Sequence, residues 1–195
     1  MKAEKLRPDF AIPDELFEQA SRIRLVLFDV DGVLTDGRLF FSDNGDEGKS
    51  FHARDGLGMN LLQQSGVAVG IITARRSSLV EHRARDLDIK HLYQGRKEKF
   101  PAYIELCESL NLLSTEVAFV GDDVVDLPIM LDVGLAITVP EGHKLVKQHA
   151  HWTTPHQGGS GAARDVCELI MFAQGTYGKM LEQFLSADAT SVTGN

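Results

Sequence analysis

The sequence predicts an α/β protein with a Rossmann-like parallel sheet and helices on both faces. Five apolar runs of strand length alternate with segments whose apolar residues recur at helical spacing. Strands that are apolar throughout are typical of a parallel sheet that is covered on both sides. The 195 residues are enough for one domain with a sizeable core, so we expect a single domain over residues 1–195.

The first half of the chain holds three of the expected strands, at residues 23–30, 67–74 and 90–94. Between the first two, residues 56–66 have a helical pattern. Gly66 is expected to end this helix, because glycine readily adopts the left-handed conformation found after many helices. A second helix is expected over residues 77–88, with Ser77 or Ser78 as its N-cap.

The second half continues the alternation. Its strands are expected at residues 116–123 and 135–140, and its helices at residues 97–111, 125–134, 143–150 and 161–174. Pro101 fits the first of these helices only near its first turn, where the missing N–H has no helical partner. The polar tail at residues 186–195 is expected to be disordered.

Residues 37–56 interrupt the alternation. They hold two short strand-like pieces around DNGDEG, which is typical of a β-hairpin turn. The segment is too short for a separate cap domain, and an isolated two-stranded ribbon is only marginally stable. Because Phe40, Phe41 and Phe51 need cover, we expect this hairpin to pack against other subunits.

Composition excludes several classes of protein. The formal net charge is −8, whereas a nucleic-acid-binding surface is basic. No apolar run approaches the length of a membrane span, and the first residues lack the apolar core of a signal peptide. Cys107 and Cys167 lie in apolar helical patterns and suggest buried thiols in a reducing compartment. We therefore expect a cytoplasmic protein with no nucleic-acid or membrane partner.

Acidic and polar residues follow the strands of this predicted sheet. Asp29 and Asp31 end the first strand, Thr73 ends the second, and Asp122 follows the fourth, with Asp126 close behind. In such sheets ligands bind outside the carboxyl ends of the strands. Adjacent carboxylates repel unless a cation offsets them, and a hard divalent ion such as Mg²⁺ prefers oxygen ligands. The sequence therefore predicts a magnesium site at this edge.

The motifs resemble a known superfamily. DVDGVLTDG, IITAR, the lysine Lys99 and VGDDVVD are similar, in order and spacing, to the four motifs of the haloacid dehalogenase-like phosphatases. The hairpin insert together with KSFHARDGLG, HLYQG and GGSGAARDVCELI resembles the capless, tetrameric 3-deoxy-D-manno-octulosonate 8-phosphate (KDO 8-phosphate) phosphatases. The resemblance implies a homotetramer assembled through residues 37–56.

The resemblance also implies catalytic roles. Asp29 is expected to be the nucleophile that forms an aspartyl-phosphate, and Asp31 the general acid that protonates the leaving sugar oxygen and later the base that activates water. Thr73 and Lys99 are expected to bind phosphoryl oxygens. Hydrolysis would give KDO and phosphate for lipopolysaccharide synthesis.

The same resemblance implies a ligand set for Mg²⁺. The side chains of Asp29 and Asp122 and the backbone carbonyl of Asp31 are expected to bind the ion. Asp123 or Asp126 is expected to support these ligands. Asp123 has an equally simple alternative role as a favourable charge at a helix start.

The sugar phosphate is expected near the HARDG segment. The implied substrate-binding residues are Asp31, His52, Ala53, Arg54, Asp55, Gly56, Asn60, Arg75, Arg83 and Lys99. Cationic side chains there suit a sugar that carries its own carboxylate. Asn60 departs from the family pattern, in which an arginine is frequent, and this leaves room for a nine-carbon, sialic-acid-like sugar phosphate.

Simpler interpretations stay open at this point. Asp29 and Asp31 could be ordinary turn residues after a strand, and Lys97 competes with Lys99 for the role in the third motif. The glycine-rich residues 156–164 could be a connector or could help to close a pocket, including one on a neighbouring subunit. A non-catalytic assembly module is a further alternative.

Overall fold

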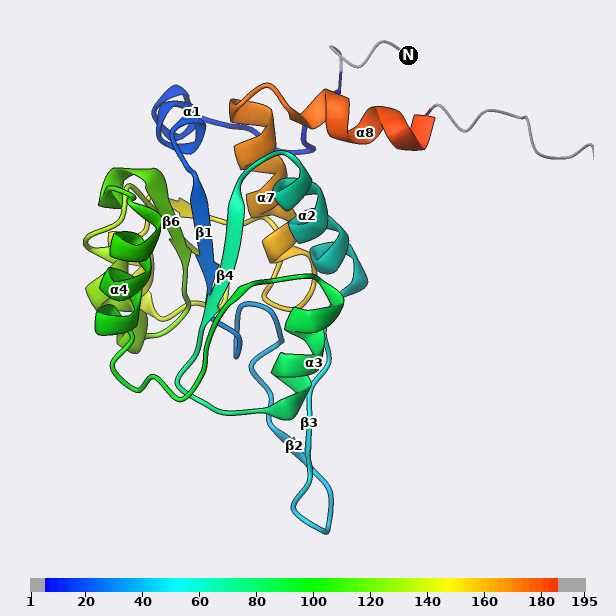
Figure 1. Ribbon diagram of the computed structural model, residues 1–195, viewed down its shortest axis with the longest axis vertical. Coiled ribbons are helices and arrows are strands. Elements are labelled where there is room, and N and C mark those ends of the chain that lie inside the picture. Colours follow the sequence, from blue (N-terminus) through cyan, green and yellow to red (C-terminus); the bar gives the residue numbers. More distant parts are fainter. Residues whose placement is uncertain (1–5, 186–195) are drawn as a thin grey trace, which may run out of the picture.

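The computed structural model describes residues 6–185 and confirms the α/β class. Its main sheet has six parallel strands in the order β5-β4-β1-β6-β7-β8. The strands are β1 (Leu25–Phe28), β4 (Ala68–Ile72), β5 (His91–Tyr93), β6 (Val117–Val120), β7 (Leu135–Thr138) and β8 (Trp152–Thr153). The order places β1 near the middle, with the chain winding first to one side and then to the other (Figure 1).

Helices cover both faces of this sheet. One face packs against α1 (Asp14–Ser21), α2 (Ala53–Gln64), α3 (Ser78–Asp86), α7 (Ala162–Ala173) and α8 (Tyr177–Leu185). The other packs against α4 (Phe100–Leu110), α5 (Leu127–Met130) and α6 (Lys144–His149). Side chains of β1 alternate between the two cores: Val26 and Phe28 enter the first, and Leu25 and Leu27 the second.

Among residues 6–185, α1, β8, α8 and the short 3-10 helix η2 (Ser114–Glu116) were not expected from the sequence. β8 is a two-residue edge strand, which is too short to show an apolar pattern. Helix α2 begins at Ala53, before the expected start at residue 56, and directly follows His52, whose backbone is extended. The tail at residues 186–195 lies outside the described residues.

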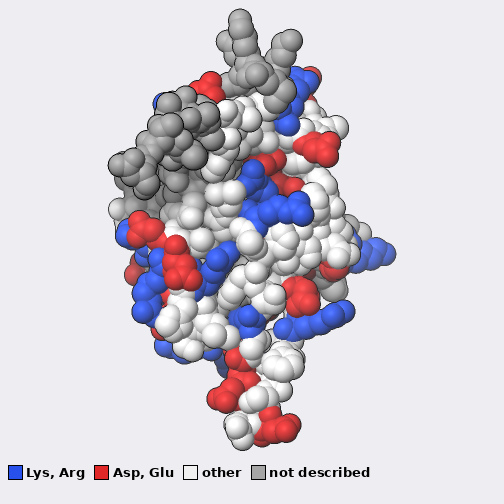
Figure 2. Space-filling view, turned by 90° about the vertical axis from the view of Figure 1, so that its right-hand side faces the viewer, with Lys and Arg blue, Asp and Glu red and all other residues white. Residues whose placement is uncertain are grey.

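The hairpin forms as a two-stranded antiparallel ribbon of β2 (Phe40–Phe41) and β3 (Glu47–Gly48). It projects from the end of the molecule at which β1 finishes (Figure 1), and acidic side chains gather along it (Figure 2). Phe40 is 69% exposed and Phe41 is 53% exposed, whereas Phe51 packs against the core. The ribbon therefore carries bare aromatic surface in one copy of the chain.

Cys107 and Cys167 are both buried free thiols. Among residues 6–185, the helices are all too short or too polar to cross a bilayer.

Candidate active site

The carboxyl ends of three neighbouring strands bring the predicted acids together. Phe28, the last residue of β1, pairs with Ile71 of β4 on one side and with Val120 of β6 on the other. The residues that follow these strands therefore emerge side by side. The amide of Asp29 continues the ladder by donating to the Val120 carbonyl at 3.0 Å.

Lys99 reaches this edge from the helix side. It occupies the N-cap position of α4, and its side chain is 1% exposed. Its Nζ lies 2.8 Å from Asp29 Oδ1 and 2.7 Å from Asp126 Oδ1. Burial tends to lower the Lys99 pKa, but the two carboxylates outweigh this and raise it. Lys97 is exposed, so the lysine that meets the carboxylates is Lys99.

Asp126 fixes the loop that carries Asp122. It is completely buried, and its Oδ2 accepts hydrogen bonds from the amides of Asp122 at 3.0 Å and Asp123 at 3.2 Å. Asp123 instead caps the short helix η3 (Val124–Asp126) by accepting from the Val124 amide at 2.8 Å. Of the two acids that the sequence left open, Asp126 contacts the site and Asp123 supports the helix start.

The acidic cluster fits a hard divalent cation. Carboxylate oxygens of Asp29, Asp122 and Asp126 lie within 4.8 Å of one another. Burial raises the pKa of Asp29 to about 6, with Lys99 opposing and Asp126 reinforcing the shift. Burial and the neighbouring acids raise the pKa of Asp122 to about 7, and its buried Oδ1 has no hydrogen-bond partner in the described chain. Three acids against one ammonium leave excess negative charge for Mg²⁺ to offset.

Gly32 makes the close approach of Asp122 possible. Its φ is +99°, and a Cβ at this position would lie 2.1 Å from Asp122 Oδ2. Glycine is thus required both for the backbone conformation and for the space. The sequence shows a glycine directly after Asp31. Only the fold shows that the Asp122 carboxylate occupies the space that a side chain at position 32 would need.

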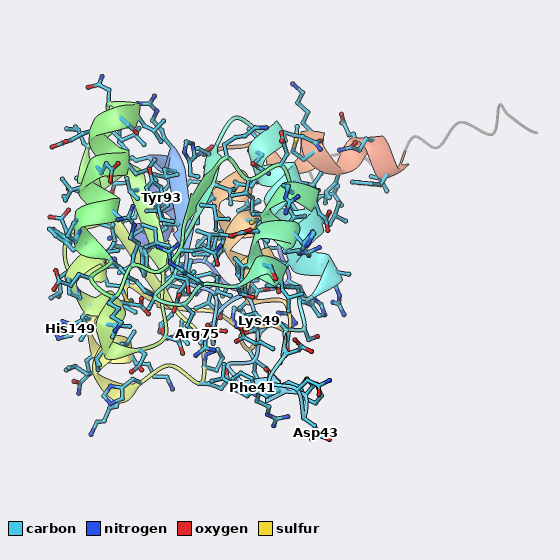
Figure 3. All side chains as sticks on the ribbon, turned by 60° about the horizontal axis from the view of Figure 1, so that its bottom comes forward. Phe41, Asp43, Lys49, Arg75, Tyr93 and His149 are labelled. Atoms are coloured by element: carbon cyan, nitrogen blue, oxygen red, sulfur yellow. The ribbon has the colours of Figure 1, made fainter. Side chains whose placement is uncertain are left out.

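The carboxylate of Asp31 is not part of this acidic cluster and contacts two cations instead. Lys49 Nζ contacts Asp31 Oδ1, and Arg75 Nε lies 3.8 Å from Asp31 Oδ2. Glu47 pairs with both cations, because its Oε1 lies 3.2 Å from Lys49 Nζ and 2.9 Å from Arg75 Nη2. Figure 3 shows Lys49 and Arg75 at the base of the hairpin, with Phe41 and Asp43 farther out along it. Sequence reasoning missed Lys49 and Glu47, because no local pattern shows that the hairpin returns to this acid.

Thr73 is buried directly after β4, and its Oγ1 accepts from the Arg75 amide at 3.4 Å. This bond holds the turn that presents Arg75 beside Asp31. Thr73 therefore occupies the strand end expected for a phosphoryl contact, and the contact itself stays a prediction.

Several predicted substrate residues serve the packing of α2. Asp55 is buried and accepts from the Arg164 amide at 2.8 Å. Arg83 donates to the His52 carbonyl at 3.1 Å, and a Cβ at Gly56 would lie 2.3 Å from its guanidinium. Ala53 and Arg54 are exposed and Asn60 is half-buried. Substrate contact by this group stays a prediction.

The glycine-rich segment packs against its own chain. The Gly159 amide donates to the Val33 carbonyl at 2.9 Å, and a Cβ at Gly158 would lie 1.8 Å from the Gly32 carbonyl oxygen. A cavity of about 510 Å³ lies beside this contact and reaches Asp122. Its lining includes Asp36, Arg38, Glu141, Gln157 and Ser160. The segment thus forms one wall of an open approach to the acids.

Comparisons with known proteins agree with this geometry. A sequence model for haloacid dehalogenase-like hydrolases matches residues 91–164. The 3-deoxy-D-manno-octulosonate 8-phosphate phosphatase of Yersinia pestis is 45% identical over 163 residues, which cover 84% of this chain and 87% of that protein. The protein of the same name from Escherichia coli K12 is 44% identical and covers 83% of this chain and 86% of its own.

Solved structures give the same result. The crystal structure of the Yersinia pestis phosphatase has a TM-score of 0.84 at 44% identity, covering 85% of this chain and 90% of that one. The phosphatase of Moraxella catarrhalis, in complex with a magnesium ion, a phosphate ion and KDO, has a TM-score of 0.87 at 38% identity. It covers 89% of this chain and 99% of its own.

Proposed function

Because the chain belongs to the 3-deoxy-D-manno-octulosonate 8-phosphate phosphatases, within the haloacid dehalogenase-like hydrolases, we propose that it hydrolyses KDO 8-phosphate to KDO and phosphate. The observation that carries this proposal is the position of Lys99 between Asp29 and Asp126, with Asp122 beside them. An anionic nucleophile can approach a phosphate ester only where positive charge is concentrated.

In the first step, Asp29 attacks the phosphorus through a carboxylate oxygen. The bond from phosphorus to the sugar oxygen breaks, and its electron pair goes to that oxygen, which takes a proton from the Asp31 carboxyl group. Lys99 pairs with the transferred phosphoryl oxygens, and Thr73 donates to them. Asp29, Asp122 and the Asp31 carbonyl would hold Mg²⁺, whose charge, when bound, offsets that of the acids and the phosphate.

In the second step, water attacks the phosphorus of the aspartyl-phosphate. Asp31, now ionised, takes the proton from this water, and the bond to the Asp29 oxygen breaks with its electron pair returning to the carboxylate. Phosphate leaves, and Asp31 again holds a proton for the next cycle. One carboxyl group thus serves as acid and then as base.

The proposal includes assembly and location. Bare Phe40 and Phe41 on the hairpin support a homotetramer in which the hairpin contacts neighbouring copies. The two free buried thiols support a cytoplasmic location, where thiols stay reduced. The acidic net charge gives no support to a nucleic-acid partner.

Phosphate release across a panel of sugar phosphates, with and without Mg²⁺, tests the function. We expect the highest kcat/KM with KDO 8-phosphate and loss of turnover when EDTA removes the metal. A higher kcat/KM with a nine-carbon 9-phosphate would favour the alternative substrate. Absence of phosphate release from every sugar phosphate would leave a non-catalytic role.

A further inference from the structure

We propose that Lys49, which directly follows the return strand β3 of the hairpin, is a positioning residue that orients the general acid Asp31 for proton transfer to the leaving oxygen. The proposal rests on the function proposed above, since Asp31 needs this orientation only if it transfers a proton to a leaving group. Lys49 lies eighteen residues from Asp31 in the chain, and the contact forms because the hairpin folds back over the end of β1.

Lys49 is a buried cation that is paired with two acids. Its side chain is 1% exposed, and its ammonium contacts Asp31 and lies 3.2 Å from Glu47. A buried lysine is retained only where acids offset the cost of removing it from water. Burial and the two acidic partners restrict the Lys49 ammonium, and its contact with Asp31 Oδ1 restrains the orientation of the Asp31 side chain.

Glu47 links Lys49 to a second cation, Arg75. Its side chain is 16% exposed and pairs at 2.9 Å with Arg75, which itself lies 3.8 Å from the second oxygen of Asp31. Both oxygens of Asp31 thus face a cation, and the two cations share Glu47. Lys49 and Arg75 restrain the rotation of the carboxyl group, and their ion pairs connect the base of the hairpin to the catalytic acid.

A general acid is needed in proportion to the basicity of the leaving group. A sugar alkoxide leaves only with a proton, whereas p-nitrophenolate is a stable anion that departs without one. The ratio kcat/KM reports steps up to the departure of the alcohol, so it isolates this proton transfer from the later attack of water. A loss confined to the sugar phosphate identifies a defect in the general acid.

The test compares Lys49→Met, which keeps the length of the side chain without its charge, with Lys49→Arg, which restores a cation. With Mg²⁺ and KDO 8-phosphate, we expect Lys49→Met to lower kcat/KM about 10- to 100-fold, because misplacing a catalytic group can cost about 100-fold. With p-nitrophenyl phosphate, we expect kcat/KM to stay close to the wild-type value. Lys49→Arg should recover part of the loss. Lys90→Met, which removes an exposed lysine directly before β5, should leave kcat/KM unchanged for both substrates.

Thermal melts and size-exclusion chromatography show whether each variant keeps its fold and assembly. Equal losses on both substrates would overturn the proposal, because they would indicate a phosphate contact or a structural defect. Full activity of Lys49→Met on the sugar phosphate would also overturn it. A wild-type protein inactive on both substrates would instead contradict the proposed function.

Discussion

Gly32 and Asp122 lie in such close contact that a methyl group on Gly32 would stand 2.1 Å from the Asp122 carboxylate. The loop after the first motif and the acid of the fourth motif therefore fit together only through a glycine. This contact couples the backbone around Asp31 to the proposed metal ligand.

Gly32→Ala should therefore impair catalysis by displacing Asp122. Gly66→Ala is the matched control, since Gly66 has a φ of +102° but nothing within 4 Å of an added Cβ. Backbone strain should cost each variant roughly 1–2 kcal/mol of stability. The clash with Asp122 adds to that cost in Gly32→Ala alone. Only Gly32→Ala should also weaken Mg²⁺ activation, measured as phosphate release against Mg²⁺ concentration. Equal Mg²⁺ dependence in the two variants would refute the proposed coupling.

Lys99→Met should lower kcat by at least about 10²–10³-fold, the cost of removing one charged group that stabilises the transition state. Lys97→Met, two residues away and exposed, should keep wild-type kinetics. Steady-state phosphate release measures both. If Lys97→Met were the inactive variant, the assignment of the third motif would be wrong.

Mg²⁺ should raise the melting temperature, because the ion binds the folded acids and not the unfolded chain. Asp122→Asn should reduce this gain, since it removes one charge from the crowded cluster of Asp29, Asp122 and Asp126. Differential scanning fluorimetry with Mg²⁺ and with EDTA measures the shift. An undiminished gain in Asp122→Asn would place the ion elsewhere.

Phe40→Asp should reduce the mass of the assembly in solution. Phe40 is 69% exposed in one copy, and a charge there would oppose burial against a neighbouring chain. Leu113→Asp is the control, because Leu113 is 70% exposed away from the hairpin. Light scattering after size exclusion gives the masses, and a wild-type monomer would contradict the proposed tetramer.

Asp55 should make stability depend on pH. Burial raises its pKa, with the Arg164 amide opposing the shift. The folded protein therefore holds this proton more tightly than the unfolded chain does. The stabilisation that comes from this proton is complete below the pKa of Asp55 in the unfolded chain. It is lost as the pH rises through the raised pKa of Asp55 in the folded protein.

Asp55→Asn should remove that loss, so its melting temperature relative to wild type should rise as the pH increases from about 4 to about 8. Asp88→Asn controls for removal of an exposed carboxylate. Melts across this range measure the difference. If the melting temperature of Asp55→Asn relative to wild type fell as the pH increased, the predicted effect of Asp55 on stability would be wrong.

The sequence by itself determined the sheet and the residues at its carboxyl edge. A buried parallel strand is apolar throughout, and the residue after it must emerge at that edge. The sequence alone therefore places Asp29, Thr73 and Asp122 together. The family motifs added roles to these positions and singled out Lys99.

Only the tertiary structure decided which groups support these residues. Asp126 and Asp123 have the same chemistry in the sequence, but the turn of η3 buries the first against Lys99 and uses the second as a cap. Lys49 reaches Asp31 because the hairpin returns over the strand end. Such contacts depend on how separate segments pack, and a local pattern of residue types carries no information about that packing.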